Sequence, residues 1–560
     1  MKLKNILYSM MMGTAVLTGT TSCVSDLDQY PHTETTSKDV YTSLANYEAV
    51  LGKIYAAMVT SGQGKGGDNK DMESVLNKGA GFDYMRMFIN MQECGTDEFA
   101  STWLTGEQTT GLTYLSWDAN DAWVSDMYYR IYYNIALCNE FLRNANSASF
   151  SGADAEKMKE YKAEVRFMRA LFYYHALDFY RNIPMVTEND PVGSYIPPRY
   201  TPQQTFDYIE SELKDCVGDM LPASTCPYGQ ASQGAAYTLL AKLYLNSEVY
   251  TGVAKYAECK EACEKVMSMG YSLEDNYSKL FNADNDKRTN EIIFALPVSA
   301  EHTVSWGSST YLVCGQVSMS NANQNVADYG VTAGWSEFRL RPEFVDKFTQ
   351  TDIDGNGDKR CKFFTNGQSK DVTSMTDETA GYLSEKWSNL KDDGTTASNT
   401  GDAGVDTDFP LFRLADVYLM YAECVARTVE DKDKLDDWAG GSDAESDSRK
   451  QGAIYWINKV RERAYGKDEN GNPKGQVWKE NFSSKDAFLQ FILDERAREL
   501  YHEGYRRTDL IRFGEFTTSK YIWQWKGGTH DGQAVDSKYN IYPIPNTELT
   551  ANPNLHNDNY

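Results

Sequence analysis

The sequence predicts a predominantly α-helical protein in which helix pairs flank a loop-rich region with few short strands. Apolar residues recur at steps of three and four over two long stretches, as they do on one face of a helix. Between about residues 271 and 410 this period fades, and Gly, Asn, Thr and Ser mix with short strand-like runs. The chain has 560 residues and is 41% hydrophobic and 24% charged, which is typical of a folded protein with a large core.

The first helical stretch is predicted over about residues 40–270. Its apolar period is clear in 123–142 and again in 167–177, and Pro184 ends the second of these helices because proline cannot donate the helical hydrogen bond. A further helix is expected across 235–245. Paired helices of about 15 to 20 residues are typical of tetratricopeptide-like arrays, in which neighbouring repeats bury each other's apolar faces. The signature residues of that repeat do not recur cleanly, so the repeats are degenerate.

The region from about 271 to 410 is predicted to be a loop-rich insertion, with strand-like runs at 292–296 and 310–313. The helical period then resumes at 412–426, 453–465 and 485–502. A second helical stretch therefore covers about 411–514. We expect the two helical stretches to close into one body around the insertion.

The N-terminus has the organisation of a secretory signal. Two lysines, an apolar segment over residues 6–17 and a run of small residues precede Cys23. This order predicts a lipoprotein signal peptide at 1–22, lipidation of Cys23 and a polar tether over 23–39; ordinary cleavage near Ser22 with a free thiol is the alternative. The apolar segment is too short to span a bilayer, which takes about 20 residues, so we do not expect a transmembrane protein.

Composition excludes several functions. With 80 acidic and 55 basic residues the formal net charge is −25, and such a chain repels nucleic acid, whose binding needs clustered Lys and Arg. Six histidines are scattered without a Ser-His-Asp or Cys-His arrangement, so a nucleophilic enzyme is not supported. The nine cysteines beyond Cys23 are odd in number and cannot all be paired within one chain.

Glu495, Glu499 and Glu503 form an acidic stripe at helical spacing that could be mistaken for a catalytic pair. Glycoside hydrolysis needs two carboxylates that face each other across the substrate, usually from different elements. Arginines such as Arg496 and Arg498 interleave with the stripe and favour a structural lattice of ion pairs. We therefore predict a protein without enzymatic activity, with a surface glycoside hydrolase as an alternative.

One segment resembles the opening of a calcium-binding loop. Asp352, Asp354 and Asn356 supply oxygen ligands at positions 1, 3 and 5, and Gly357 stands at position 6. Phe363 stands at position 12, where a calcium loop has its bidentate glutamate. The segment is interpreted either as a calcium site completed by a carboxylate from elsewhere or as a plain turn. No other cofactor is predicted.

Five segments carry further recognisable motifs. They are 164–173 (EVRFMRALFY), 235–242 (AAYTLLAK), 412–423 (FRLADVYLMYAE), 494–500 (DERAREL) and 542–545 (YPIP). Taken together, they resemble the SusD/RagB family of surface glycan-binding lipoproteins over nearly the whole chain.

The resemblance implies a single α-rich fold over residues 40–560. It also implies that the protein captures a polysaccharide or oligosaccharide and delivers it to a SusC-like TonB-dependent outer-membrane transporter. Asp26 and Asp28 resemble the acidic signal that sends such lipoproteins to the outer face, so we expect a lipid-anchored protein in the outer membrane that faces the extracellular side. A repeat scaffold that binds peptides or proteins is a further alternative.

Two loop-like regions combine aromatic and polar side chains, as a glycan site requires. Sugars stack their C–H faces on flat rings and exchange hydrogen bonds with Asp, Asn and Arg. Members of the family commonly place ligand-stacking aromatics in these two regions. The predicted ligand contacts are Asp97, Trp103, Trp306, Tyr311, Asn321 and Trp335. For each loop tryptophan, partial burial against its own loop is the alternative.

Overall fold

A computed structural model describes most of the chain beyond residue 39. The described residues are 40–560 without 65–70, 73–81, 402–403, 437–448 and 559. The predicted signal peptide, Cys23 and the tether lie outside them. The chain divides into two compact units, Met1–Val50 and Leu51–Tyr560. Helix α3 (Leu44–Ala56) begins in the first unit, and everything below concerns the second. Among the described residues, no helix has the length and apolar character needed to cross a membrane.

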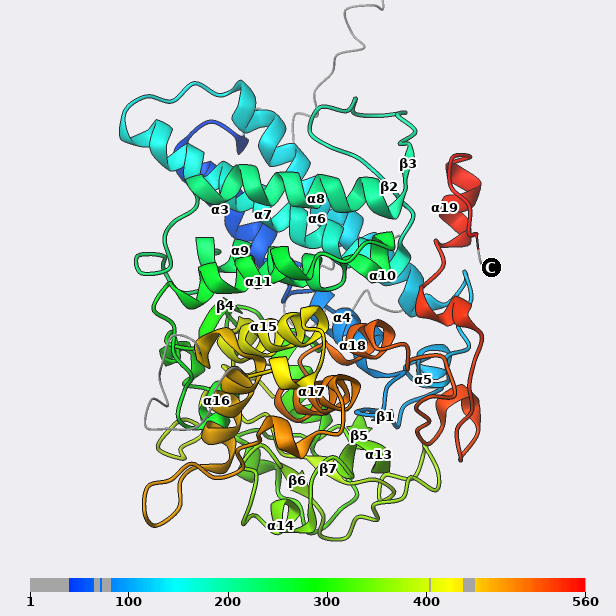
Figure 1. Cartoon of the computed structure of the whole chain (residues 1–560). Helices are drawn as coiled ribbons and strands as arrows, with labels where there is room; N and C mark the ends of the chain where they lie inside the picture. The colour runs from blue at the N-terminus through cyan, green and yellow to red at the C-terminus, as the bar shows by residue number, and fades with distance from the viewer. Residues whose placement is uncertain (1–39, 65–70, 73–81, 402–403, 437–448, 559) are drawn as a thin grey trace, which may run out of the picture. The chain divides into compact units, whose positions relative to one another are not determined.

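Long helices that pack on their neighbours in sequence make up the first half of the second unit (Figure 1). They are α6 (Ala122–Ser147), α7 (Ala153–Tyr180), α8 (Pro202–Cys216), α9 (Gln233–Leu245) and α11 (Tyr256–Met267). Helix α6 packs on α7, α7 on α8, α8 on α9, and α9 on α11. Each helix thus covers the apolar face of the one before it, which is how a helical array builds its core.

Local sequence determines where these helices begin. Thr201 and Gln204 form a reciprocal capping box at the start of α8, and Pro202 occupies the first turn, where no backbone donor is needed. The Ser232 side chain accepts a hydrogen bond from the backbone N–H of Ala235 at the start of α9.

The second half supplies α15 (Leu414–Thr428), α16 (Ala453–Tyr465), α17 (Lys485–Leu500) and α18 (Arg506–Arg512). Helix α15 packs on α11, α16 and α17, so it joins the late helices to the early array (Figure 1). The shorter elements are α4 (Tyr84–Glu93), α5 (Thr110–Tyr114), α10 (Ser247–Thr251), α12 (Ser308–Gly315), α13 (Pro342–Val345), α14 (Gln350–Ile353) and α19 (Asn546–Ala551).

The strands of the described residues are short and pair two by two. The antiparallel pairs are β1 (Ala100–Ser101) with β5 (Phe338–Arg339), β2 (Ile183–Pro184) with β3 (Arg199–Tyr200), β4 (Ile292–Leu296) with β8 (Phe409–Arg413), and β6 (Phe363–Phe364) with β7 (Leu383–Ser384). The predicted fold class, predominantly α with few short strands, is confirmed. The strand predicted at 292–296 is confirmed as well, but 310–313 lies inside helix α12, because four apolar residues alone do not distinguish a buried helix from a buried strand.

The acidic stripe of α17 and the loop after it is part of the core. Glu499 and Glu503 are buried and form ion pairs with Arg413, and Glu499 also pairs with Arg360 and Arg463. Burial raises the pKa of Glu499, but the three arginines outweigh burial and lower it to about 2. The structural interpretation of this stripe is confirmed.

Candidate functional site

Three of the predicted tryptophans line one open cleft. Trp103, Trp306 and Trp335 share it with Phe82, Arg86, Glu107, Met319 and Glu337, and its volume is about 270 Å³. Trp103 is 39% exposed and Trp306 41%, and no other tryptophan in the described part of the chain is as exposed. Exposed aromatic side chains that gather in one cleft often mark a binding site.

The pairing of β1 with β5 brings two of these tryptophans together. The two strands are antiparallel, with Ser101 opposite Phe338. The backbone N–H of Thr102 donates to the carbonyl of Glu337 at 2.9 Å and so continues the ladder by one residue. The indole N–H of Trp103 then donates to the carbonyl of Trp335 at 3.0 Å. This bond fixes the orientation of the Trp103 ring, and 39% of the residue stays exposed.

Asp83 holds the loop that carries Trp306. It caps helix α4 by accepting from the backbone N–H of Arg86 at 2.9 Å. The same carboxylate accepts from the hydroxyl of Ser305 at 2.6 Å and from the backbone N–H of Ser308 at 3.1 Å. Gly307 allows this approach, because a Cβ there would lie 2.2 Å from an Asp83 oxygen. The Trp306 loop is therefore fixed from both sides.

Arg86 forms the floor of the cleft between two rings. Its guanidinium carbon lies 3.9 Å from the centre of the Phe82 ring and 4.3 Å from that of Tyr311. One terminal nitrogen donates to the carbonyl of Trp306 at 2.8 Å. The other lies 3.3 Å from a Glu337 oxygen and 3.9 Å from a Glu107 oxygen. Arg86 thus links the Trp306 loop to the two acidic side chains.

The polar groups of this floor are incompletely satisfied. Nε of Arg86 and one carboxylate oxygen of Glu107 are buried and have no hydrogen-bond partner among the described residues. Burial raises the pKa of Glu337 to about 7, although Arg86 opposes the shift. Buried polar groups without partners are rare and need an explanation, and a bound ligand is one. The cleft therefore combines aromatic rings with the charged side chains of Arg86, Glu107 and Glu337.

The structure corrects three of the predicted ligand contacts. Tyr311 is buried below Arg86, and its hydroxyl donates to the Asn90 side chain at 2.7 Å. Asn321 is buried and donates to the carbonyl of Asn366 at 2.8 Å, which holds two loops together. Both side chains are buried and make hydrogen bonds within the protein, so neither is placed to contact a ligand in the cleft.

Asp97 is the third correction. It is fully buried and accepts two hydrogen bonds from Arg506, at 2.7 and 2.8 Å. Burial raises its pKa, but Arg506 and Lys347 outweigh burial and hold it well below its usual range. Asp97 fixes the loop before Trp103 and does not reach the cleft.

Sequence reasoning missed the polar floor and the rim. Arg86, Glu107, Glu337 and Met319 all line the cleft, yet none was singled out. The one sequence feature near Arg86 is Asp83, three positions earlier, which caps helix α4. A capping residue indicates where a helix begins and says nothing about a ligand.

The segment predicted to bind calcium forms a capped turn. One oxygen of Asp352 accepts from the backbone N–H and hydroxyl of Thr349, and the other accepts from the backbone N–H of Asp358 at 2.7 Å. Asp354 accepts from the Gln350 side chain, and the Asn356 side chain donates to the carbonyl of Asp354. Within the described ranges no three His, Cys, Asp or Glu side chains converge as a metal site would require. Calcium binding stays a prediction, without a converging set of ligands.

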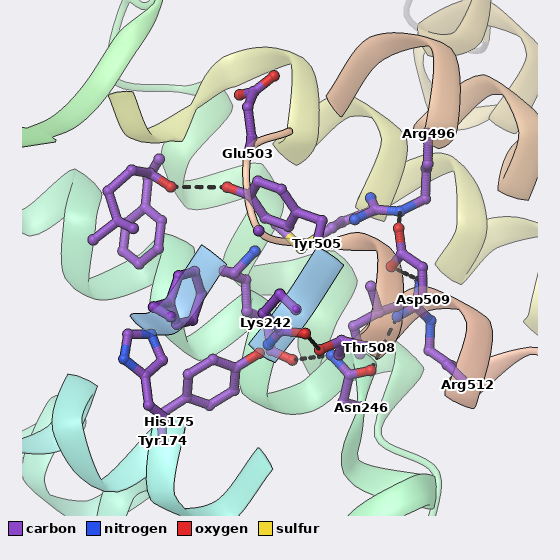
Figure 2. A pocket seen from close by; sticks show the side chains of 17 residues that line it. Tyr174, His175, Lys242, Asn246, Arg496, Glu503, Tyr505, Thr508, Asp509 and Arg512 are labelled. Carbon is purple, nitrogen blue, oxygen red and sulfur yellow. Dashed lines mark hydrogen bonds and ion pairs between the residues drawn. The ribbon is translucent and has the colours of Figure 1, made fainter. Parts of the chain in front are cut away.

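A second cavity lies inside the helical core and belongs to the fold. Figure 2 shows it among Lys242, Tyr505, Asp509, Arg496 and other side chains from several helices. Its volume is about 30 Å³, which is room for about one or two water molecules and too little for a sugar. Asp509 accepts hydrogen bonds from Arg496 at 2.7 Å and from Arg512 at 2.7 Å.

Comparisons with known proteins agree with this fold. Residues 356–560 match the family described as "SusD family", and residues 27–245 match the one described as "Starch-binding associating with outer membrane". The chain is 33% identical to the starch-binding protein SusD of Bacteroides thetaiotaomicron, with 99% of each chain covered. It is 25% identical to SusD-like protein P25 of Formosa agariphila over 78% of each.

Solved structures share the same architecture. A SusD-like carbohydrate-binding protein of Bacteroides fragilis has a TM-score of 0.67 at 19% identity, with 92% of this chain and 100% of that chain covered. Surface glycan-binding protein A of Bacteroides thetaiotaomicron, in complex with laminarihexaose, has a TM-score of 0.66 at 17% identity, with 92% and 99% covered. The fold, the two family matches and the full-length similarity lead to one conclusion: the chain belongs to the SusD family.

Proposed function

We propose that this protein is a surface glycan-binding protein that holds a polysaccharide or oligosaccharide in the tryptophan cleft without cleaving it. The observation that carries the proposal is the meeting of Trp103, Trp306 and Trp335 in one cleft with the charged side chains of Arg86 and Glu107. Ring faces take up the C–H faces of a sugar, and the floor exchanges hydrogen bonds with its hydroxyls.

The dimensions of the cleft favour part of a long chain over a small enclosed molecule. Pockets that enclose a small ligand have volumes of roughly 300 to 1,000 Å³, and this open cleft has about 270 Å³. It can therefore contact a short run of sugar units while the rest of the chain extends into solvent. The similarity to a protein named for starch binding makes an α-glucan the first ligand to test, and a β-glucan related to laminarihexaose the second.

A surface glycoside hydrolase is the second candidate, because Glu337 has its pKa raised to about 7, in the range that a general acid uses. The arrangement of the carboxylates opposes it. Glu107 and Glu337 both approach the same nitrogen of Arg86, at 3.9 and 3.3 Å, and so lie on one floor of the cleft. A hydrolase needs its two carboxylates on either side of the scissile bond.

The proposal includes attachment to the outer membrane through lipidated Cys23, with the cleft on the extracellular side and delivery of the glycan to a SusC-like TonB-dependent transporter. The match to a family described as "Starch-binding associating with outer membrane" supports association with that membrane. Labelling with a radioactive fatty acid tests the anchor: wild type takes up label and Cys23→Ala does not. Co-purification of a transporter from solubilised outer membranes tests the partnership.

Affinity electrophoresis of the full chain in detergent, in gels that contain starch or laminarin, tests the ligand. Retardation of wild type in one of these gels, lost in Trp306→Ala, supports the proposal. An assay for new reducing ends on the same polysaccharides separates the two candidates: steady release would favour the hydrolase. Absence of binding across a glycan array, together with binding to peptides, would favour the scaffold alternative.

A further inference from the structure

A second open groove lies apart from the tryptophan cleft. It has a volume of about 460 Å³ and is lined by the segment 271–275, by α15, by α16 and the residues that follow it, and by Lys359. It shares no lining residue with the tryptophan cleft. The two sites can therefore be altered independently.

The charge of this groove is opposite to that of the chain. Lys359, Lys459, Arg463 and Lys467 line it against two acidic residues, whereas the whole chain has a formal net charge of −25. A groove that gathers cations on an acidic protein focuses a positive potential that attracts anions.

The lysines of the groove differ in whether they have an ion pair or a ring contact within the protein. Lys467 pairs with Glu462 at 3.4 Å, and the ammonium of Lys459 lies 5.1 Å from the centre of the Tyr455 ring. No ion pair joins exposed Lys359 to an acidic side chain in the described part of the chain. The Lys359 ammonium lies close to Gly466: a Cβ added to that glycine would be 3.2 Å from the ammonium nitrogen. Lys359 is therefore available to an anion in the groove.

Arg463 joins the groove to the buried ion pairs of the core. It lines the groove but is only 8% exposed, and its terminal nitrogens contact Glu291 at 3.3 Å and Glu499 at 2.5 Å. Its Nε is buried and has no hydrogen-bond partner among the described residues. Arg463 therefore belongs mainly to the wall of the groove, which it anchors to the helical core.

Two tyrosines indicate which chemical class of ligand the groove suits. Tyr271 and Tyr418 are half-buried and line the groove, and the Tyr418 ring packs on Trp456 at 4.4 Å between centres. Aromatic rings beside lysines suit a ligand with flat apolar faces and negative charges. The two acidic lining residues, Asp275 and Glu462, can accept hydroxyls but repel a chain that offers only carboxylates. These features favour a saccharide over an acidic peptide.

We propose that this groove is a second binding site, for oligosaccharides that carry carboxylate groups. The proposal goes beyond neutral-glycan capture by the tryptophan cleft. A polymer with uronic acid branches that spans both sites would gain overall affinity from the two linked contacts without any new interaction.

Calorimetric titration of the full chain in detergent with tetragalacturonic acid at low salt tests the proposal. Lys359→Gln should weaken binding about fivefold, as expected for one partly exposed ion pair, and the additional change Lys459→Gln should weaken it further. Lys391→Gln, an exposed lysine outside the groove, is the matched control and should leave binding unchanged. Raising the salt concentration should reduce the affinity of wild type.

Three outcomes would overturn the proposal: wild type does not bind the uronate at low salt, Lys359→Gln binds as well as wild type, or tetraglutamate binds as tightly as the saccharide. Starch retention and melting temperature are measured on every variant. Since none of the lysines lines the tryptophan cleft, starch retention should persist in all of them. Failure of this inference is thus distinguished from failure of the proposed function and from unfolding.

Discussion

Arg86 and Arg413 have similar surroundings, but they differ in how many of their guanidinium nitrogens donate hydrogen bonds. Both guanidiniums lie against aromatic rings and beside two or more glutamates. In the helical core, every nitrogen of Arg413 donates to Glu291, Glu499 or Glu503. In the cleft, Nε of Arg86 has no partner in the described residues, and its contacts with acids are long.

The difference shows that residue types alone do not separate these two clusters, whereas the hydrogen bonding of the central arginine does. Arg413 has no nitrogen left for a ligand, and its removal would leave buried charges unpaired. Arg86 holds its two acidic partners through longer contacts and lines an open cleft, so fewer of its bonds serve the fold. Changes to the core should therefore affect stability, and changes to the cleft should affect binding.

The largest effect is expected in the core. Arg413→Ala removes the common partner of three buried glutamates and should reduce the free energy of unfolding by about 3 to 5 kcal/mol. Denaturant titration measures it. Arg86→Ala is the contrasting variant, with a smaller loss of stability and a loss of glycan retention. Equal destabilisation by both changes would contradict the distinction.

The second effect concerns pH. The folded pKa of Glu337, about 7, lies above its ordinary value of 4.5, so its contribution to stability is complete below about pH 4.5 and is lost as pH rises through 7. Glu337→Gln should remove up to about 3 kcal/mol of this dependence. Thermal melts of both proteins between pH 5 and 8 measure it. If the melting temperatures of the two proteins changed with pH in the same way, the pKa of Glu337 would not be raised in the folded protein.

Gly307→Ala tests whether Asp83 positions the tryptophan loop. The added Cβ would lie 2.2 Å from an Asp83 oxygen, so the loop must shift at a cost of about 1 to 3 kcal/mol, and glycan retention should weaken with it. Gly218→Ala is the control, because a Cβ there meets no atom within 4 Å. Unchanged glycan retention in Gly307→Ala would mean that the loop accommodates the added methyl group without moving Trp306.

The smallest effect on stability is expected for Trp306→Ala. The ring is 41% exposed, and the hydrogen bond to Arg86 uses the backbone carbonyl, which alanine retains. Stability should change by less than about 0.5 kcal/mol, while glycan affinity falls about tenfold, or about 1.4 kcal/mol. Affinity electrophoresis and a thermal melt on the same sample measure both. A large drop in melting temperature would show that the ring is structural.

Sequence reasoning predicted the helices well, because an apolar face leaves a periodic signal along a continuous segment. It selected Trp103, Trp306 and Trp335, because large rings in loop-like regions are unusual, and the structure brings all three to one cleft. It selected Asp97 wrongly, because nothing near that residue reveals Arg506, more than 400 positions later, as its partner. The floor was missed for the same reason: two-residue strands such as β1 and β5 leave no sequence signal, yet their pairing builds the site.

The bond from Trp103 to Trp335 spans 232 positions of the chain. Closing so long a loop costs conformational entropy that only later contacts recover, so this surface should form late in folding. A partly synthesised chain that contains Trp103 but not Trp335 would hold only one wall of the cleft. Only the fully folded chain can then bind sugar through both walls of the cleft. Glycan present during refolding should therefore raise the yield of native protein, because it stabilises the folded state alone.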